Sequence, residues 1–210
     1  NPAVSFAVFL VNEKFTLKDF GYYAAAQLVG GAAAAFSYFV VWGSHFHVGP
    51  VGSYTWVEAV SVEFHYTAFL AFCVLNTALA QANAGNEYYG LTVGFTVVAG
   101  GYACGKISGG FLNPAIVLAN DFVSFRTGVG YSFLYAAFQM LGGAAAAGLY
   151  RVVRPEEFGG TAQTLVAKLL SEFLGTYMLV LTVGLNVLAS ATADKATCAL
   201  SAAAAYMCAI

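Results

Sequence analysis

The chain has 210 residues, of which 60% are hydrophobic and only 9% are charged, and its formal net charge is −2. Soluble domains carry about 25% charged residues, so this composition excludes an ordinary soluble enzyme, and the high apolar fraction excludes a disordered segment. The lack of excess basic charge excludes a nucleic-acid-binding protein. A multi-pass integral membrane protein remains, although composition does not indicate which membrane holds it.

Long apolar segments follow one another along the chain, each close to the 20 or so residues that a helix needs to cross a bilayer. Charged residues gather between them, and the segments lack the alternation of apolar and polar residues that a membrane β-strand requires. We therefore predict an all-α membrane protein. The predicted spans cover 21–42, 56–80, 88–105, 129–150 and 165–189, and a sixth begins near Thr197.

Two apolar segments, 1–11 and 113–120, are too short to cross a membrane, and each begins with Asn-Pro-Ala. Asparagine is a strong N-cap, and proline is favoured at the first position of a helix. Each segment therefore predicts a half-helix of two or three turns. A half-helix at membrane depth is tolerated only where it is buried in protein or lines a water-filled cavity.

The sequence contains an internal repeat. Asn113 and Gln139 repeat Asn1 and Gln27 at an offset of 112 residues, and pairs of glycines and runs of four alanines coincide at the same offset. A second match relates SVEFHYTAFL, beginning at Ser61, to LSEFLGTYML further along the chain. The repeated unit is a helix with a glutamate, a second helix, a half-helix and a third helix. Three spans are an odd number, so successive units insert in opposite orientations.

The repeats divide the chain into three parts. Residues 1–42 form the end of a first half-repeat, 56–153 a complete second half-repeat, and 165–210 the start of a further first half-repeat. This order is out of phase with the repeated unit. The chain is interpreted either as a window on a tandem array of such units or as a numbering that joins parts of one. In both cases the parts suffice to assemble one pore.

The Asn-Pro-Ala boxes and the repeated helices resemble those of a known family. Two Asn-Pro-Ala half-helices in inverted three-helix repeats resemble the aquaporin, or major intrinsic protein, family. NPAVSFAVFLV, with YYAAAQLVGG after it, is similar to the first box and third helix of the family. GLTVGFTVVAGGYACGKISGGFLNPAI is similar to the fifth helix and second box. The resemblance covers nearly the whole chain and implies a bundle of six transmembrane helices plus two half-helices.

The resemblance also implies a function. Family members assemble as homotetramers with one pore in each subunit, and they pass water or small uncharged solutes without a cofactor. Two half-helices that meet head to head place the positive ends of their dipoles at the pore centre, where a cation is repelled and a neutral molecule is not. The pore boxes would be Asn1, Pro2, Ala3, Asn113, Pro114 and Ala115.

A second constriction is implied at Gly101, Gly110 and Ile116. Ile116 stands where the family usually carries an arginine, and Gly101 stands where water-selective members carry a histidine. The constriction is therefore expected to be wide and apolar. Such an opening suits glycerol, urea-like solutes and hydrogen peroxide. A ring of Tyr102 or Phe111 across it would close the pore.

Glu63 and Glu172 are carboxylates within apolar segments, where charge is costly and marks function. The resemblance implies that each glutamate supports a half-helix by accepting N–H groups of its loop. A proton relay is the alternative role.

Other chemistry finds little support in the sequence. It contains no catalytic constellation, so we do not expect an enzyme. The four cysteines lack metal-ligand spacing, and His45 and His47 lack a third ligand nearby. The rival function is a non-conducting, aquaporin-like structural subunit of a larger membrane complex.

Overall fold

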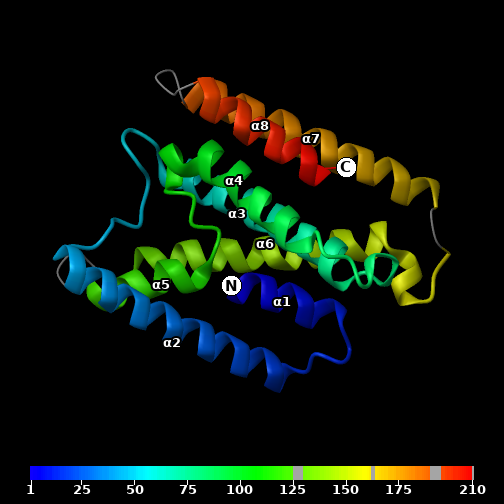
Figure 1. Ribbon diagram of the computed structural model, residues 1–210, viewed down its shortest axis with the longest axis horizontal. Coiled ribbons are helices and arrows are strands. Elements are labelled where there is room, and N and C mark those ends of the chain that lie inside the picture. Colours follow the sequence, from blue (N-terminus) through cyan, green and yellow to red (C-terminus); the bar gives the residue numbers. More distant parts are fainter. Residues whose placement is uncertain (125–129, 162–163, 190–194, 210) are drawn as a thin grey trace.

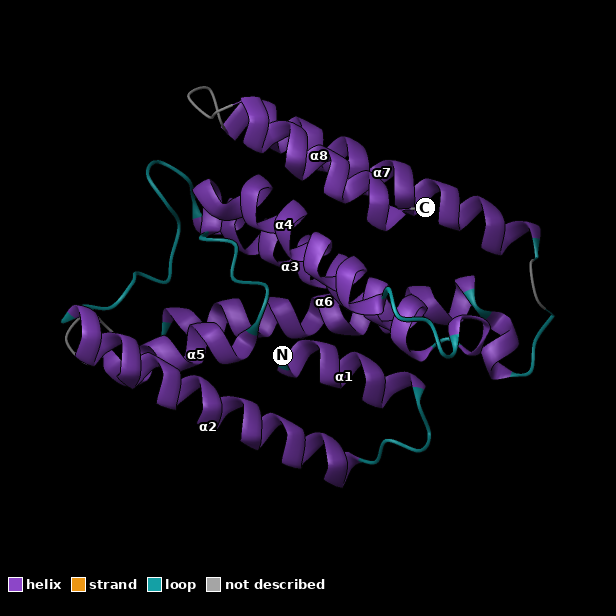
Figure 2. Ribbon diagram, in the orientation of Figure 1, coloured by secondary structure: helices purple, strands orange, loops and turns teal. Residues whose placement is uncertain are grey.

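The structure is a computed structural model that describes residues 1–124, 130–161, 164–189 and 195–209. The regular elements in these ranges are all helical, as Figure 2 shows. This confirms the predicted all-α class. The long helices are α2 (Leu17–Trp42), α3 (Trp56–Val74), α4 (Tyr89–Ser108), α6 (Tyr131–Val153), α7 (Leu165–Ala189) and α8 (Lys195–Ala209), and the half-helices are α1 (Pro2–Val11) and α5 (Pro114–Val123).

The observed helix ends differ by a few residues from the predicted ones. Helix α2 begins at Leu17 rather than at residue 21, because Thr16 and Asp19 form a capping box. The hydroxyl of Thr16 accepts the Asp19 N–H at 3.2 Å, and the Asp19 carboxylate accepts the Thr16 N–H at 2.9 Å. Helix α3 ends at Val74, and a π-helical turn, Leu75–Leu79, completes the span predicted over 56–80.

Four of the described helices are long and apolar enough to cross a membrane. They are Leu17–Trp42, Trp56–Leu79, Tyr131–Val153 and Leu165–Leu188. The spans predicted at 88–105 and from Thr197 form helices α4 and α8, which are not among the four helices that are both long and apolar enough. Helix α4 has 20 residues, and at about 1.5 Å per residue this length matches the hydrocarbon core of a bilayer.

The helices form three groups, which Figure 1 shows from one side. Helix α3 packs against α4 and α6 in the middle of the molecule. The two half-helices and α2 lie along one side, and the pair α7 and α8 lies along the other. Ala99 of α4 is buried with Ala204 and Ala205 of α8, so small residues allow these two helices to approach closely.

Candidate functional site

The two half-helices begin next to each other. The side-chain oxygen of Asn1 accepts the Ala3 N–H at 3.1 Å, and that of Asn113 accepts the Ala115 N–H at 2.9 Å. The amide Nδ2 of Asn1 donates to the carbonyl of Leu112 at 2.7 Å. Leu112 directly precedes Asn113, so this hydrogen bond joins the starts of two half-helices that are 111 residues apart in sequence.

Each half-helix packs against a glycine of a long helix. A Cβ at Gly143 of α6 would collide with the carbonyl oxygen of Ala3, and a Cβ at Gly31 of α2 would lie 3.0 Å from that of Ala115. Gly31 and Gly143 are equivalent in the repeat, as are Ala3 and Ala115. The prolines Pro2 and Pro114 are buried at the first helical positions. The structure thus brings the six box residues together, and each half-helix start packs against the equivalent glycine of a long helix.

A buried glutamate holds the loop before the second box. Glu63 of α3 is fully buried, and its carboxylate accepts the N–H groups of Phe111 at 2.9 Å and Leu112 at 2.8 Å. The Ser108 hydroxyl and the Gln139 amide each donate to the same carboxylate at 2.7 Å. Four donors therefore surround one carboxylate, which offers about four acceptor sites.

The loop that Glu63 holds contains backbone strain. Leu112 has a φ of 50°, the left-handed region that costs a residue with a side chain about 1 kcal/mol or more. The hydrogen bond from the Leu112 N–H to Glu63 offsets this cost and keeps the Leu112 carbonyl directed at Asn1. The Ser108 hydroxyl also accepts the Gly110 N–H at 3.1 Å. Ser108 was not predicted as a site residue, although a hydroxyl directly before Gly-Gly is a signal for a capped loop.

Two of the three proposed constriction residues, Gly101 and Gly110, are neighbours in the structure. A Cβ at Gly110 would lie 3.3 Å from the Cα of Gly101, so these two glycines are neighbours. Ile116 is 42% exposed. Of the two rings that would close a pore, that of Phe111 packs against Phe46 with 5.3 Å between ring centroids, and Tyr102 is 44% exposed.

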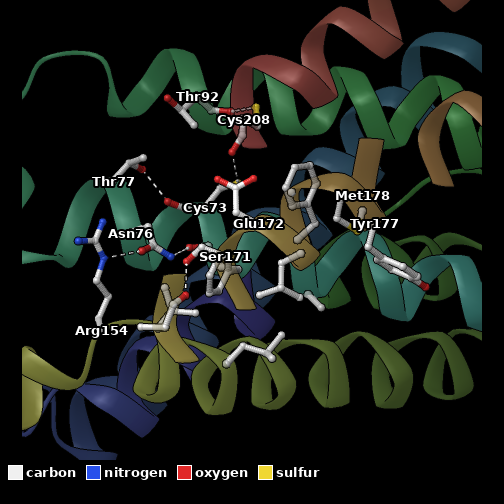
Figure 3. A pocket seen from close by; sticks show the side chains of 18 of the residues that line it. Cys73, Asn76, Thr77, Thr92, Arg154, Ser171, Glu172, Tyr177, Met178 and Cys208 are labelled. Atoms are coloured by element: carbon white, nitrogen blue, oxygen red, sulfur yellow. Dashed lines mark hydrogen bonds between the residues drawn. The ribbon is translucent and has the colours of Figure 1, made fainter. Parts of the chain in front are cut away.

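Glu172 lies in different surroundings from Glu63. It is exposed and lines a cavity of about 770 Å³ whose walls come from α3, α4, α6, α7 and α8. Figure 3 shows its carboxylate directed into this cavity, toward Thr92 and Cys208. Among the described residues it has no hydrogen-bond partner. The expected support of half-helix α1 by Glu172 is therefore not present, because α7 packs on α4, α6 and α8 rather than beside α1.

The cavity is lined by both apolar and polar side chains. Arg154 Nε donates to Asn76 Oδ1 at 3.0 Å, which ties α6 to the end of α3, as Figure 3 shows. This cavity could not be predicted from the sequence, because it forms only where α7 and α8 meet the central helices. In the part of the chain that the structure describes, no three His, Cys, Asp or Glu side chains gather to hold a metal ion.

The chain is similar to known membrane channels. The family model for the major intrinsic protein matches twice, over residues 1–102 and 79–210. Aquaporin NIP1-3 of Oryza sativa subsp. japonica is 34% identical over 159 residues, which cover 73% of this chain and 53% of the relative. Nodulin-26 of Glycine max is 31% identical over 157 residues, 73% of this chain and 56% of the relative. An aquaglyceroporin of Toxoplasma gondii is 28% identical over 116 residues, 55% and 43% of the two chains.

This chain spans about half the length of the curated relatives it matches most extensively. No solved structure matches it. The family model nevertheless covers both ends of the chain, and the Asn-Pro-Ala boxes are packed as a matching pair. The chain is therefore an integral membrane protein that belongs to the major intrinsic protein family, the family of the aquaporins.

Proposed function

We propose that this chain forms a transmembrane channel for passive permeation of water and small uncharged solutes. The observation that carries the proposal is the meeting of the two half-helix starts through Asn1 and the Leu112 carbonyl. Unpaired N–H groups and a partial positive charge occupy the N-terminus of each helix. Two such ends at one place repel a cation and leave a neutral molecule unaffected, which is how aquaporin-type pores exclude ions.

The second box supplies a donor for a passing solute. Asn113 uses its side-chain oxygen to cap α5, and its amide nitrogen has no partner among the described residues. That amide can donate to the oxygen of water or of a polyol. The Asn1 amide donates one of its two hydrogens to the Leu112 carbonyl, whereas both hydrogens of the Asn113 amide remain for the solute. The two boxes therefore contribute unequally, because Asn1 also joins the half-helices.

The proposed constriction is wide and apolar. Gly101 and Gly110 are neighbours and have no side chains, and Ile116 supplies no fixed charge. We therefore infer a solute range that includes glycerol, urea-like molecules and hydrogen peroxide. One of the similar proteins carries the name aquaglyceroporin, which agrees with this range.

The architecture of the channel follows from the repeats. We propose that residues 1–42 and 165–210 belong to half-repeats of the first kind and 56–153 to the second, and that four chains assemble into a homotetramer. The second candidate function, a non-conducting structural subunit, is favoured by one observation: Glu172 does not support the first half-helix as Glu63 supports the loop of the second.

Stopped-flow measurements on proteoliposomes test the channel. Water, glycerol and hydrogen peroxide should cross faster than through bare lipid. Gly101→Phe should abolish this excess, because no atom lies within 4 Å of a Cβ there and the ring would fill the constriction. Gly148→Phe, at an equally open position of α6, is the matched control and should conduct. Folded protein that raises none of the three permeabilities would support the structural subunit instead.

A charge at the constriction tests its assignment. Ile116→Arg should lower the ratio of glycerol to water permeability, because it adds the fixed positive charge and bulk that this position lacks. Ile116→Met keeps the position apolar and should leave the ratio unchanged. An unchanged ratio in the arginine variant would show that Ile116 does not face the pore.

A further inference from the structure

Two of the four cysteines lie next to each other in the folded chain, although they are 135 residues apart in sequence. The Cys73 thiol of α3 donates to the carbonyl oxygen of Cys208 of α8 at 3.8 Å, and the two thiols also interact directly. Helix α8 packs mainly on α4 and α7, so this contact joins it to the central helix α3. The thiols of Cys104 and Cys198 donate instead to carbonyl groups of other residue types.

Both members of this pair border the cavity of about 770 Å³ between the central helices and the pair α7 and α8. Figure 3 shows Cys73 and Cys208 at its wall. Cys73 is only 3% exposed, whereas Cys208 is half-buried. The cavity is far larger than the roughly 30 Å³ that one water molecule occupies in the liquid, so a small polar molecule fits beside the thiols. The structure describes all four cysteines, and Cys104 and Cys198 do not line this cavity.

The surroundings of the two thiols differ, and this difference assigns their roles. The Cys208 sulfur accepts a hydrogen bond from the Thr96 hydroxyl at 3.4 Å, and its own S–H donates to the Thr92 carbonyl at 3.3 Å. A thiolate is the reactive form of cysteine, and a hydroxyl that donates to the sulfur favours that form. Cys208 is therefore the residue that reacts first with a molecule in the cavity. Cys73, which is nearly buried beside it, is placed to react with the product.

We propose that Cys73 and Cys208 are a modification site at which hydrogen peroxide forms a disulfide between α3 and α8. The Cys208 sulfur attacks one oxygen of the peroxide, the O–O bond breaks, and the other oxygen leaves as water with the thiol proton. Cys208 is then a sulfenic acid. The Cys73 sulfur attacks the Cys208 sulfur, the S–O bond breaks, and a second water leaves with the Cys73 proton. Two thiols are oxidised to one disulfide, and one peroxide is reduced to two waters.

The disulfide requires a rearrangement of one side chain. The two sulfur atoms of a disulfide lie about 2.05 Å apart, so the Cys208 thiol has to leave the Thr92 carbonyl and turn toward Cys73, with which it already interacts. The new bond holds α8 against α3. Hydrogen peroxide is among the solutes proposed above, but the inference concerns thiol chemistry in the cavity and holds whether or not the chain conducts.

Mass spectrometry tests the link. The unmodified chain in detergent micelles should lose two of its four thiols to hydrogen peroxide, and the peptides that contain Cys73 and Cys208 should be recovered joined to each other. A dithiol reductant should restore both thiols. A link to Cys104 or Cys198, a link between two copies of the chain, or the survival of all four thiols would each refute the proposal.

Single substitutions test the assigned order of the two cysteines. Cys73→Ser should leave Cys208 as a sulfenic acid, which dimedone traps as a stable adduct, because no thiol remains beside it. Cys208→Ser should leave Cys73 as an unmodified thiol. A chain with both Cys104→Ser and Cys198→Ser is the matched control and should form the disulfide as fast as the unmodified chain. A dimedone adduct on Cys73 in the Cys208→Ser chain would contradict the assigned order.

The hydrogen bond to the Cys208 sulfur provides a measurement of rate. Thr96→Val keeps the shape of the side chain but removes the hydroxyl that donates to Cys208, so the disulfide should form more slowly. Thr67→Val is the matched control, because the Thr67 hydroxyl of α3 is buried without a partner among the described residues. That variant should react at the rate of the unmodified chain. Equal rates in both variants would show that Thr96 does not activate Cys208 and would overturn its role as the first residue to react.

Discussion

Two glutamates in matching sequences behave differently in this molecule. Glu63 of α3 is fully buried and accepts four hydrogen bonds, whereas Glu172 of α7 is exposed at the wall of a cavity and has no hydrogen-bond partner among the described residues. Phenylalanine and threonine follow both glutamates at the same spacing, although His65 and Tyr66 stand where the second sequence has leucine and glycine. The cause is the partner helix: α3 packs on the glycine and glutamine face of α6, and α7 does not reach the equivalent face of α2.

The half-helices, in contrast, keep the repeat symmetry. Gly143 of α6 packs against Ala3, and Gly31 of α2 packs against Ala115, at equivalent positions of the repeat. The contacts between half-helices and long helices thus follow the repeat: α1 packs on α6 as α5 packs on α2. The contacts between long helices do not, because α3 packs on α6 but α7 does not pack on α2. One chain therefore completes both boxes but only one of the two glutamate supports. Three pairs of equivalent substitutions test this comparison.

The largest contrast is expected between Glu63→Ala and Glu172→Ala. Glu63→Ala leaves the N–H groups of Phe111 and Leu112 and the Gln139 amide without an acceptor, whereas the Ser108 hydroxyl can still donate to the Cys104 carbonyl. Each buried donor without a partner costs about 1–3 kcal/mol, so the free energy of unfolding should fall by at least about 3 kcal/mol. The second alters an exposed side chain and should change stability by less than about 0.5 kcal/mol. Unfolding titrations in detergent micelles measure both. Equal losses would mean that Glu172 has a buried partner.

The second contrast concerns the glycines that seat the half-helices. Gly143→Ala should destabilise the fold by about 1–3 kcal/mol, because the new Cβ would overlap the Ala3 carbonyl oxygen and α1 would have to move. Gly31→Ala should cost less, since its Cβ would be 3.0 Å from the Ala115 carbonyl oxygen. The same titrations rank the two variants. If Gly31→Ala lowered the free energy of unfolding more than Gly143→Ala, α5 rather than α1 would be the half-helix that packs more closely on its long helix.

The smallest contrast concerns two tyrosines at equivalent repeat positions. The Tyr38 hydroxyl of α2 donates to Asn120 Oδ1 at 2.8 Å, whereas the Tyr150 hydroxyl of α6 is buried without a partner among the described residues. Tyr38→Phe should cost about 0.5–1.5 kcal/mol, the net value of one hydrogen bond. Tyr150→Phe should be neutral or stabilising, because it removes an unsatisfied buried group. Thermal unfolding in micelles distinguishes the two; a loss at Tyr150 alone would reverse the assignment.

Much of this protein could be predicted from the sequence because local rules apply. Apolar length predicts the long helices, and Asn-Pro predicts where α1 and α5 begin, since a cap and its helix are adjacent in the chain. The repeats predict equivalent residues such as Gly31 and Gly143. The start of α2 at Leu17 was also within reach, because Thr16 and Asp19 have the spacing of a capping box.

The class of the protein, its helices and the identity of its two boxes could therefore be predicted from the residues alone. Three features became visible only in the folded chain: Asn1 joins the boxes through the Leu112 carbonyl, Glu63 holds a strained loop, and Glu172 does not hold one. The physical reason is that a repeat in sequence specifies equivalent surfaces but not which surface each one meets. In a membrane, apolar burial does not decide between partners, so close packing of small residues and satisfied polar groups make that choice.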